Sequence, residues 1–508
     1  MLRKFISHRP KTYHLPRWGS VRSGRKFVIL HRSLLTFAIC LVLAGCAYTR
    51  PINPGDGPAG AEQTALDEYV KRPDPNFRYA LHSTVKGDGV TMYVLDMTSQ
   101  EWLTPREVNR TIWKHWLTVI VPDQVKSDIA FLYITGGDIN SKAPDKVPAQ
   151  FGAMSKATGT VTAQLSGVPN QPLVFVWDDV REREEDALIA YTWDKYLKTG
   201  DTRWPARLPM TKSAKAAMNA VTGFAKEHSI DVNRYVVSGG SKRGWTAWTT
   251  AAVDDRVIAV APIVIDLLNI VPSFEHHYEV YGGYAPAVGD YMEFNTMDWT
   301  GTPEYKSLME LVEPFEYRKR LTMPKFIMNS TGDQFFLPDS SQFYFDQLEG
   351  EKYLRYVPNT DHGLGGSDAW ESAIAWYDSI VSGKERPKFS WEIDKEAGTI
   401  TVHAQDAPTV VKLWRATNPN ARNFMKDVIG QAYASTELPS SPGGTYVARV
   451  PKPEKGWTAF FVELTYPSGV AVPFKFTTPV VITPDTVEHE YNYLPHHARP
   501  RGFITTKK

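Results

Sequence analysis

The chain has 508 residues, and its 57 basic and 56 acidic residues give a net charge of +1 at pH 7. This length is enough for two globular domains, and the balanced charge excludes the strongly basic class of nucleic-acid-binding proteins. The two cysteines, Cys40 and Cys46, lie near the N-terminus, so the rest of the chain has no disulfide or cysteine-based metal site. The densest group of possible metal ligands, residues 275–279, is better explained as a polar patch on a helix. We therefore expect neither a metal nor a cofactor.

Residues 1–45 are predicted to form a lipoprotein signal peptide. They contain nine Lys or Arg and no acidic residue, and their apolar run at 34–43 is too short to span a membrane. The sequence Leu-Ala-Gly-Cys at 43–46 is typical of a lipobox, so we expect cleavage before Cys46 and acylation of its thiol. The residue after the cysteine is Ala47 and not Asp, which argues against retention in the inner membrane and favours the outer membrane. Cleavage would leave 48 basic against 56 acidic residues, a net charge of −8 that suits neither nucleic acid nor anionic headgroups.

Residues 46–61, rich in Gly and Pro, are expected to be a tether, and residues 62–385 an α/β domain. Its first predicted strands are a pair at 117–122 and 129–134 and a buried strand at 173–177. Strands that alternate with helices predict a mostly parallel, doubly wound sheet.

Gly136 and Gly137 follow the strand at 129–134. Lipases and esterases use a glycine-rich loop at this place to donate one N–H of the oxyanion hole, although a plain turn explains the pair equally well. The alternating charges at 181–186 are predicted to be a solvated helix entrance. The apolar spacing over 213–228 predicts a helix that leads into the next strand.

The sequence Gly-Gly-Ser-Lys-Arg-Gly at 239–244 lies between a predicted strand at 234–238 and a predicted helix. A glycine-flanked serine at such a turn is typical of a nucleophile elbow, in which the N–H of the next residue, here Lys242, faces the developing oxyanion. The usual pattern is Gly-x-Ser-x-Gly. Here Arg243 occupies the second position after Ser241 and the glycine comes one residue later, so an ordinary glycine-rich turn is the alternative.

Two polar residues follow later strands in the order that a Ser–Asp–His triad requires. Asp333 follows the predicted strand at 325–330, and His362 follows that at 353–358. Such a base takes the proton of the serine, and the acid orients the base. Asp266, which follows an earlier strand, is the alternative acid.

Residues 267–321 form a longer insertion than the simple fold needs, and we predict that they are a helical lid. Its aromatic residues either contact an apolar or sugar-like substrate or pack the lid down. Short alternating runs within 388–482 predict an immunoglobulin-like β-sandwich that folds separately and contributes no catalytic residue, so a chain ending near Pro387 should keep its site. Residues 486–508 are expected to be a loosely held tail.

The chain resembles the PhoPQ-activated pathogenicity-related proteins, a bacterial family with an α/β-hydrolase fold. The resemblance covers about residues 62–480 and rests on residues 66–70, 135–137, 238–244, 329–333 and 361–362. The family name links it to a two-component system of enteric pathogens that senses magnesium and cationic peptides, which implies a virulence-related role. The elbow spacing also resembles that of glucuronoyl esterases, in which the triad acid can lie elsewhere, as Asp266 does here.

The sequence therefore predicts a serine hydrolase of the cell envelope, of the esterase or peptidase class, anchored through Cys46 to the outer membrane and facing the periplasm. Its substrate would be a small molecule, a peptide or a glycan ester. The alternative is a binding or signalling lipoprotein that keeps the fold without turnover, because fold alone does not decide function. The sequence gives no indication of the oligomeric state.

Overall fold

The computed structural model describes residues 63–178 and 180–493. The predicted signal peptide, Cys46, the tether and the last part of the predicted tail lie outside the described residues. Within the described part, no helix has the length and apolar character needed to cross a membrane.

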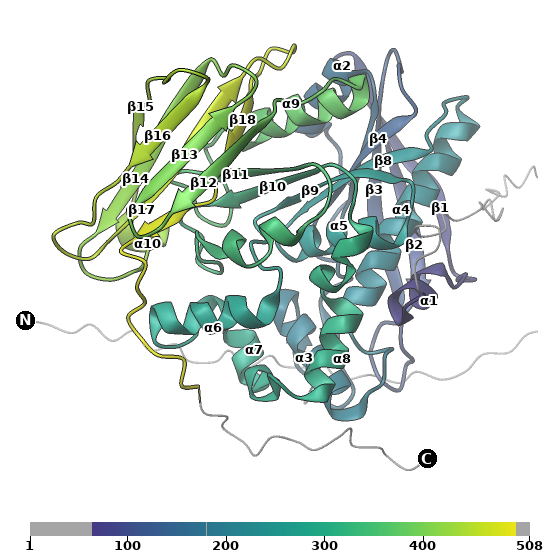
Figure 1. Ribbon diagram of the computed structural model, residues 1–508. Helices are drawn as coiled ribbons and strands as arrows, with labels where there is room; N and C mark the ends of the chain where they lie inside the picture. The colour runs from purple at the N-terminus through teal and green to yellow at the C-terminus, as the bar shows by residue number, and fades with distance from the viewer. Residues whose placement is uncertain (1–62, 179, 494–508) are drawn as a thin grey trace, which may run out of the picture. The chain divides into compact units, whose positions relative to one another are not determined.

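A mixed sheet of 14 strands runs through the described residues, in the order β1-β2-β3-β5-β4-β8-β9-β10-β11-β18-β17-β14-β15, with β19 beside β17 (Figure 1). The six strands from β5 to β11 in this order are parallel, as predicted, and both flanks are antiparallel. The strands are β1 (Arg78–Lys86), β2 (Val90–Glu101), β3 (Ile112–Pro122), β4 (Ile129–Ile134), β5 (Val161–Leu165), β8 (Arg234–Gly240), β9 (Val257–Ile263), β10 (Lys325–Ser330), β11 (Lys352–Val357), β14 (Val410–Asn418), β15 (Ala434–Glu437), β17 (Trp457–Tyr466), β18 (Phe474–Thr477) and β19 (Val481–Thr483).

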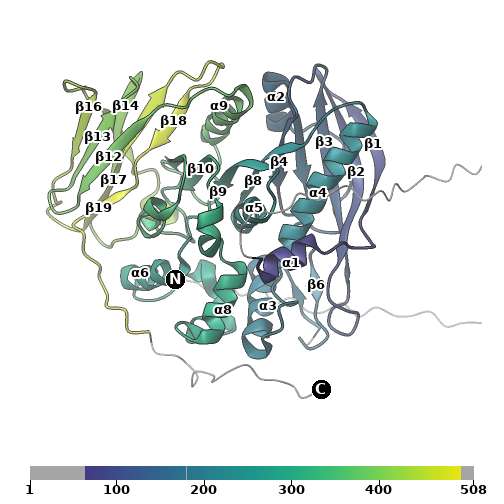
Figure 2. The ribbon, with the colours of Figure 1, turned by 45° about the vertical axis from the view of Figure 1, so that its right-hand side comes forward.

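Helices cover both faces of the parallel strands, which explains why these strands are almost continuously apolar. Side chains alternate between two cores, so that Leu132 lies in one and its neighbour Phe131 in the other. Helices α1, α4 and α5 pack on one side, and α2 and α9 on the other (Figure 2). The helices are α1 (Ala65–Lys71), α2 (Ala149–Thr158), α3 (Glu185–Thr199), α4 (Arg207–Glu227), α5 (Lys242–Val253), α6 (Ile270–Tyr281), α7 (Gly289–Glu293), α8 (Pro303–Val312), α9 (Ala369–Ser382) and α10 (Lys426–Ile429).

The N-terminal half differs from the prediction in two places. The strands predicted at 117–122 and 129–134 are not neighbours, because β5 lies between them, antiparallel to β3 and parallel to β4. The run at 173–177 is not a buried strand. Its first two residues form β6 (Leu173–Val174), which pairs with β7 (Glu182–Arg183), and Trp177 is 73% exposed.

The C-terminal strands extend the main sheet, where we expected a separate domain. Strand β18 pairs antiparallel with β11, through Leu354 and Thr477, and so covers an edge that the parallel strands would otherwise leave open. A second sheet of β12 (Phe389–Asp394), β13 (Thr399–Ala404) and β16 (Thr445–Arg449) shares an apolar core with β14, β17 and β18. Two facing sheets are therefore present, whereas the immunoglobulin-like topology stays a prediction.

A buried ion pair ties the two halves of the sheet together. Arg355 on β11 is 1% exposed, and its Nη1 donates to Glu463 Oε2 on β17 at 2.5 Å. Arg355 Nη2 donates to Asp368 at 2.8 Å, and Asp368 also pairs with Lys475 on β18. Arg355 and Asp368, from the parallel half, therefore both pair with charges on the C-terminal strands.

The described part of the predicted tail lies along the lid. The His489 N–H donates to the Glu279 carbonyl on α6 at 3.0 Å, and the Tyr493 hydroxyl donates to Asp298 at 2.6 Å. We expected this segment to be loosely held. Its described part is instead packed, because Tyr491 and Tyr493 contact Tyr278 and Tyr284 of the lid.

Replacing Glu463 by Ala should lower the free energy of unfolding by about 3–5 kcal/mol, because Arg355 would remain buried without its partner. Urea denaturation followed by circular dichroism measures the loss. Glu385→Ala is the matched control, since its ion pair with Lys388 is exposed and should contribute little to stability. Equal losses in both variants would contradict a buried pair that holds the sheet together.

Candidate active site

Ser241 occupies a strained turn between β8 and α5. Its φ of +56° and ψ of −128° lie outside the regions that a residue with a side chain usually adopts, at a cost of about 1–3 kcal/mol. The Ser241 N–H donates to the Ile263 carbonyl at 2.8 Å, and the Ser241 carbonyl accepts from the Trp245 N–H in the first turn of α5 at 3.0 Å. The serine is thereby held at the N-terminus of a helix, as a nucleophile elbow requires.

The close approach of two backbone segments explains the unusual glycine spacing. A Cβ on Gly239 would lie 2.6 Å from the Arg243 carbonyl oxygen, and a Cβ on Gly244 would lie 2.9 Å from the Gly239 carbonyl oxygen. Glycine is therefore needed at the third position after Ser241, while the second position can carry the arginine side chain.

His362 and Asp333 form a hydrogen-bonded pair. The distance between His362 Nδ1 and Asp333 Oδ2 is 2.7 Å, and Asp333 Oδ1 accepts from the Phe335 N–H at 2.8 Å. Because a carboxylate accepts, Nδ1 carries the hydrogen and Nε2 is left as the basic nitrogen. His362 and Ser241 line the same pocket. The serine hydroxyl has no hydrogen bond to another described residue, and such contacts often tighten when substrate binds.

Asp266, the alternative acid, is held elsewhere. It is 2% exposed, and its two oxygens accept from the hydroxyls of Tyr344 and Tyr356 at 2.6 and 2.7 Å. Burial raises the pKa of Asp266 to about 8 despite these two hydrogen bonds. The geometry therefore favours Asp333 as the partner of His362.

The predicted oxyanion-hole residues are not all brought together. The Lys242 N–H opens α5 directly after Ser241, where helical N–H groups have no partner within the helix. Gly136 lies against the Arg243 guanidinium, so that a side chain there would collide with it. Gly137, with φ +130°, lines a different pocket beside Gly167. Lys242 is therefore well placed beside the serine, whereas Gly136 makes room for Arg243 and Gly137 lies away from the elbow.

A cluster of charges that the sequence did not reveal surrounds the elbow. Arg243 donates to both oxygens of Glu185, at 2.7 and 2.5 Å, and Lys242 Nζ lies 2.8 Å from Glu185 and 2.9 Å from Asp186. Burial alone would raise the pKa of Glu185, but the two cations hold it well below its usual range. The predicted solvated entrance to α3 is thus half of a partly buried ion network. The alternating charges at 181–186 were the available signal, but they do not identify a partner.

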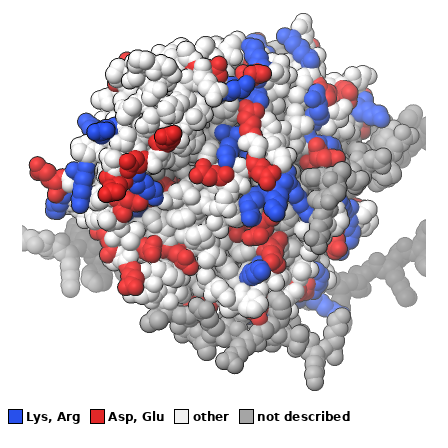
Figure 3. Space-filling model, viewed as in Figure 1, with Lys and Arg blue, Asp and Glu red and all other residues white. Residues whose placement is uncertain are grey.

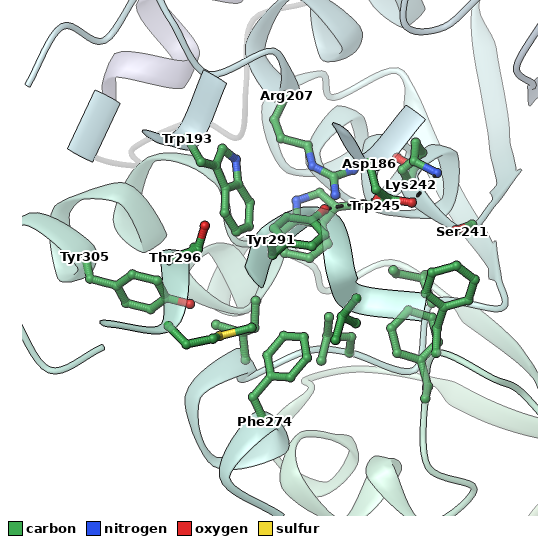
Figure 4. Close-up of a pocket in the computed structure, with 17 residues that line it drawn as sticks. Asp186, Trp193, Arg207, Ser241, Lys242, Trp245, Phe274, Tyr291, Thr296 and Tyr305 are labelled. Carbon is green, nitrogen blue, oxygen red and sulfur yellow. Dashed lines mark hydrogen bonds and ion pairs between the residues drawn. The ribbon is translucent and has the colours of Figure 1, made fainter. Parts of the chain in front are cut away.

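Two pockets meet at Ser241. The narrow pocket lies between the elbow and the lid, and its wall is largely aromatic and aliphatic, including Phe274, Tyr291 and Tyr305 from the lid (Figure 4). The space open to the centre of a water molecule there is about 40 Å³, enough for about three waters. The wide pocket, on the side of His362, offers about 340 Å³.

The aromatic residues of the lid fall into two groups. Tyr291 and Tyr305 line the narrow pocket, whereas Tyr278 and Tyr284 pack against each other and against Tyr493 of the tail. The lid region consists of α6, α7 and α8 with short 3-10 turns between them.

The C-terminal half contacts both loops of the acid–base pair. The Lys426 N–H donates to the Gly332 carbonyl, beside Asp333, at 3.0 Å, and Lys426 Nζ lies 3.1 Å from Asp361, beside His362. The side-chain amide of Asn359 exchanges two hydrogen bonds, both 2.9 Å, with the backbone of Tyr433. A chain ending near Pro387 would lack all of these contacts, contrary to the simple division of labour that we expected.

No group of three or more His, Cys, Asp or Glu residues within the described ranges is arranged to hold a metal ion. On the face shown in Figure 3, basic and acidic side chains are interspersed.

Comparison with known proteins gives a family and distant structural similarities. The sequence model of the family "PhoPQ-activated pathogenicity-related protein" matches residues 66–425. "Autocrine proliferation repressor protein A" of Dictyostelium discoideum is 35% identical over 461 residues, which cover 84% of this chain and 93% of that protein. An acetyl xylan esterase from Thermoanaerobacterium sp. aligns with a TM-score of 0.41 and 15% identity, over 61% of this chain and 91% of the esterase. A glucuronoyl esterase from Solibacter usitatus aligns with a TM-score of 0.36 and 14% identity, over 66% and 89%.

Gly239→Ala should destabilise the protein by about 1–3 kcal/mol, because the new methyl group would collide with the Arg243 carbonyl and the backbone must shift. Gly240→Ala is the control, since a Cβ there would meet no atom closer than 3.7 Å. Thermal unfolding monitored by circular dichroism compares the two variants. If Gly239→Ala unfolds at the temperature of Gly240→Ala, the close approach does not set the spacing.

Proposed function

The chain belongs to the PhoPQ-activated pathogenicity-related protein family, and we propose that it is a serine hydrolase that cleaves an ester or a peptide through Ser241, His362 and Asp333. The observation that carries the proposal is the 2.7 Å contact between His362 and Asp333 in the loops beside the strained serine. The order of the three residues along the chain is that of α/β-hydrolases.

In this proposal the Ser241 hydroxyl attacks the substrate carbonyl while His362 Nε2 takes its proton. Asp333 keeps the imidazole oriented and stabilises the imidazolium that forms. The negative oxygen of the tetrahedral intermediate would accept from the Lys242 N–H, where the positive end of the α5 dipole favours it. His362 then returns the proton to the leaving group, and a water molecule repeats the sequence to release the acyl group.

The two pockets suggest how a substrate would lie. The narrow pocket would hold the acyl side, because it is enclosed by the lid and largely apolar. The wide pocket would hold the leaving group, because His362, which must protonate that group, lies on this side. An alcohol, a sugar or an amine component would fit the larger space.

Ser241→Ala should abolish labelling by a fluorophosphonate probe while the fold persists, and should lower turnover by as much as about 10⁶. Asp333→Asn should lower the labelling rate by about 10⁴, because the base loses its orienting carboxylate. Gel fluorescence of the intact protein measures both rates.

Asp266→Asn is the matched control for Asp333→Asn. Because burial raises the pKa of Asp266 to about 8, the group is mostly neutral at pH 7, and an amide is a close mimic. We expect this variant to label nearly as the unmodified protein does. Undiminished labelling of Ser241→Ala, or a greater loss with Asp266→Asn than with Asp333→Asn, would overturn the assignment.

A signalling role is the second candidate, because the relative of 35% identity is named an autocrine proliferation repressor. In that case the protein would bind a partner and would need no turnover. An unmodified, folded protein that reacts with no fluorophosphonate would favour this candidate over the hydrolase.

We also propose that the protein is a lipoprotein of the outer membrane, anchored at Cys46 and facing the periplasm. The basic leader, the short apolar run and the residues at 43–46 support this. Several acyl chains, each worth about 0.8 kcal/mol per buried CH₂, would give stable anchoring. Cys46→Ser should release the protein from the membrane fraction and end metabolic labelling with palmitate. Palmitate labelling that persists in the variant would contradict the lipobox.

A further inference from the structure

Arg207, in the first turn of α4, is a buried cation in the wall of the narrow pocket. It is 4% exposed, and its guanidinium stacks on the Trp245 ring at 4.4 Å from the centroid (Figure 4). Its Nη1 donates to the Lys242 carbonyl at 3.0 Å. Arg207 and Ser241 thus line the same pocket, and Arg207 is joined to Lys242, the residue after the serine.

No carboxylate lies within ion-pair distance of Arg207 among the described residues, although Asp186 attracts its charge and the Tyr291 hydroxyl interacts with it. Asp186 is the carboxylate that lines the narrow pocket, and each of its oxygens already has another partner. Its Oδ2 pairs with Lys242 at 2.9 Å, and its Oδ1 accepts from the Tyr291 hydroxyl at 3.1 Å. The Nε of Arg207 is buried without a hydrogen-bond partner.

The charges around the elbow are unevenly paired. Lys242 and Arg243 lie at ion-pair distance from Glu185 or Asp186, and Asp290 is near enough to act on Asp186, whereas Arg207 has no carboxylate at ion-pair distance. A buried charge without a counter-ion is costly, so that an anion entering the pocket would gain more than one bound at the surface. Among the three cations, Arg207 is therefore the one whose charge is left for a ligand to pair with directly.

A second polar group of the pocket is also unpaired. Thr296 Oγ1, from the lid region, is buried without a partner and lines the same pocket. The remaining wall is mainly aromatic and aliphatic, so that Arg207 and Thr296 are polar contacts in an otherwise apolar space. Such an arrangement suits a short apolar group with a hydrogen-bonding end.

We propose that the narrow pocket binds an acyl group that ends in a carboxylate, with Arg207 as its counter-ion, which makes Arg207 a specificity-determining residue. This inference rests on the proposed hydrolase function. A carboxylate carries one negative charge and so matches the single charge of Arg207, whereas a phosphate group carries about 1.5–2. The substrate class is then esters or amides of short dicarboxylic acids or of acidic amino acids.

A pair of esters of similar shape tests the inference. 4-Nitrophenyl hydrogen succinate and 4-nitrophenyl butyrate share the leaving group and differ in a terminal carboxylate against a methyl group. We expect kcat/KM to be at least about tenfold higher for the succinate, since a charge-assisted hydrogen bond in a buried site is strong. Equal rates, or a preference for the butyrate, would overturn the inference.

Arg207→Met keeps most of the side-chain length and removes the charge, so it should abolish the preference. Arg207→Lys should retain part of it and shows whether charge or the planar group matters. Arg203→Met, which removes an arginine whose side chain is 50% exposed, is the control and should leave the preference unchanged. A ratio that is unaffected by Arg207→Met also overturns the inference. If that variant does not fold, the ratio for the unmodified protein still decides.

Binding without turnover separates this inference from the hydrolase itself. Isothermal titration calorimetry of the Ser241→Ala protein with N-(4-nitrophenyl)succinamic acid and N-(4-nitrophenyl)butanamide should show at least tenfold tighter binding of the acid. Preferential binding with no probe labelling of the unmodified protein would support the carboxylate site and reject the hydrolase. Probe labelling of the unmodified protein, with no preference for the acid in binding, would support the hydrolase and reject the carboxylate site.

Discussion

The carboxylate of Glu185 forms ion pairs with Lys242 and Arg243, the two residues that follow Ser241, and the geometry around the serine depends on these contacts. Because Lys242 and Arg243 are fixed by one anion at the start of α3, the first turn of α5 cannot rotate freely. Arg243 in turn packs against Gly136 and donates to the Val168 carbonyl at 2.5 Å, which joins the elbow to the loops after β4 and β5. The attraction in such a partly buried ion pair repays the cost of desolvation when its geometry is good, as in the two hydrogen bonds between Arg243 and Glu185.

Much of the parallel half of the sheet could be predicted from the sequence, because strands buried on both faces are continuously apolar. The predicted strands at 234–238, 325–330 and 353–358 are confirmed as β8, β10 and β11, and Asp333 and His362 follow the last two. A carboxylate and a base at neighbouring strand ends are brought together by topology alone.

The features that the sequence did not reveal depend on contacts between distant segments. The pairing of β18 with β11 needs backbone groups that carry no sequence signal. The prediction of a buried strand at 173–177 was wrong, because an apolar run does not distinguish a buried strand from an exposed turn. The role of Glu185 was missed because a charge in an alternating run is usually solvated, and its partners lie more than fifty residues away.

The contacts of Lys426 and Tyr433 with the loops of Asp333 and His362 have a consequence for biosynthesis. Translation proceeds from the N-terminus, so Ser241, Asp333 and His362 are synthesised before Lys426 and Tyr433, which hold the loops of Asp333 and His362 in place. Strand β18, which closes the edge of β11, follows later still. The nascent chain therefore carries Ser241, Asp333 and His362 before the framework that aligns the last two is complete. The order of the segments along the gene delays assembly of the site until translation is nearly finished.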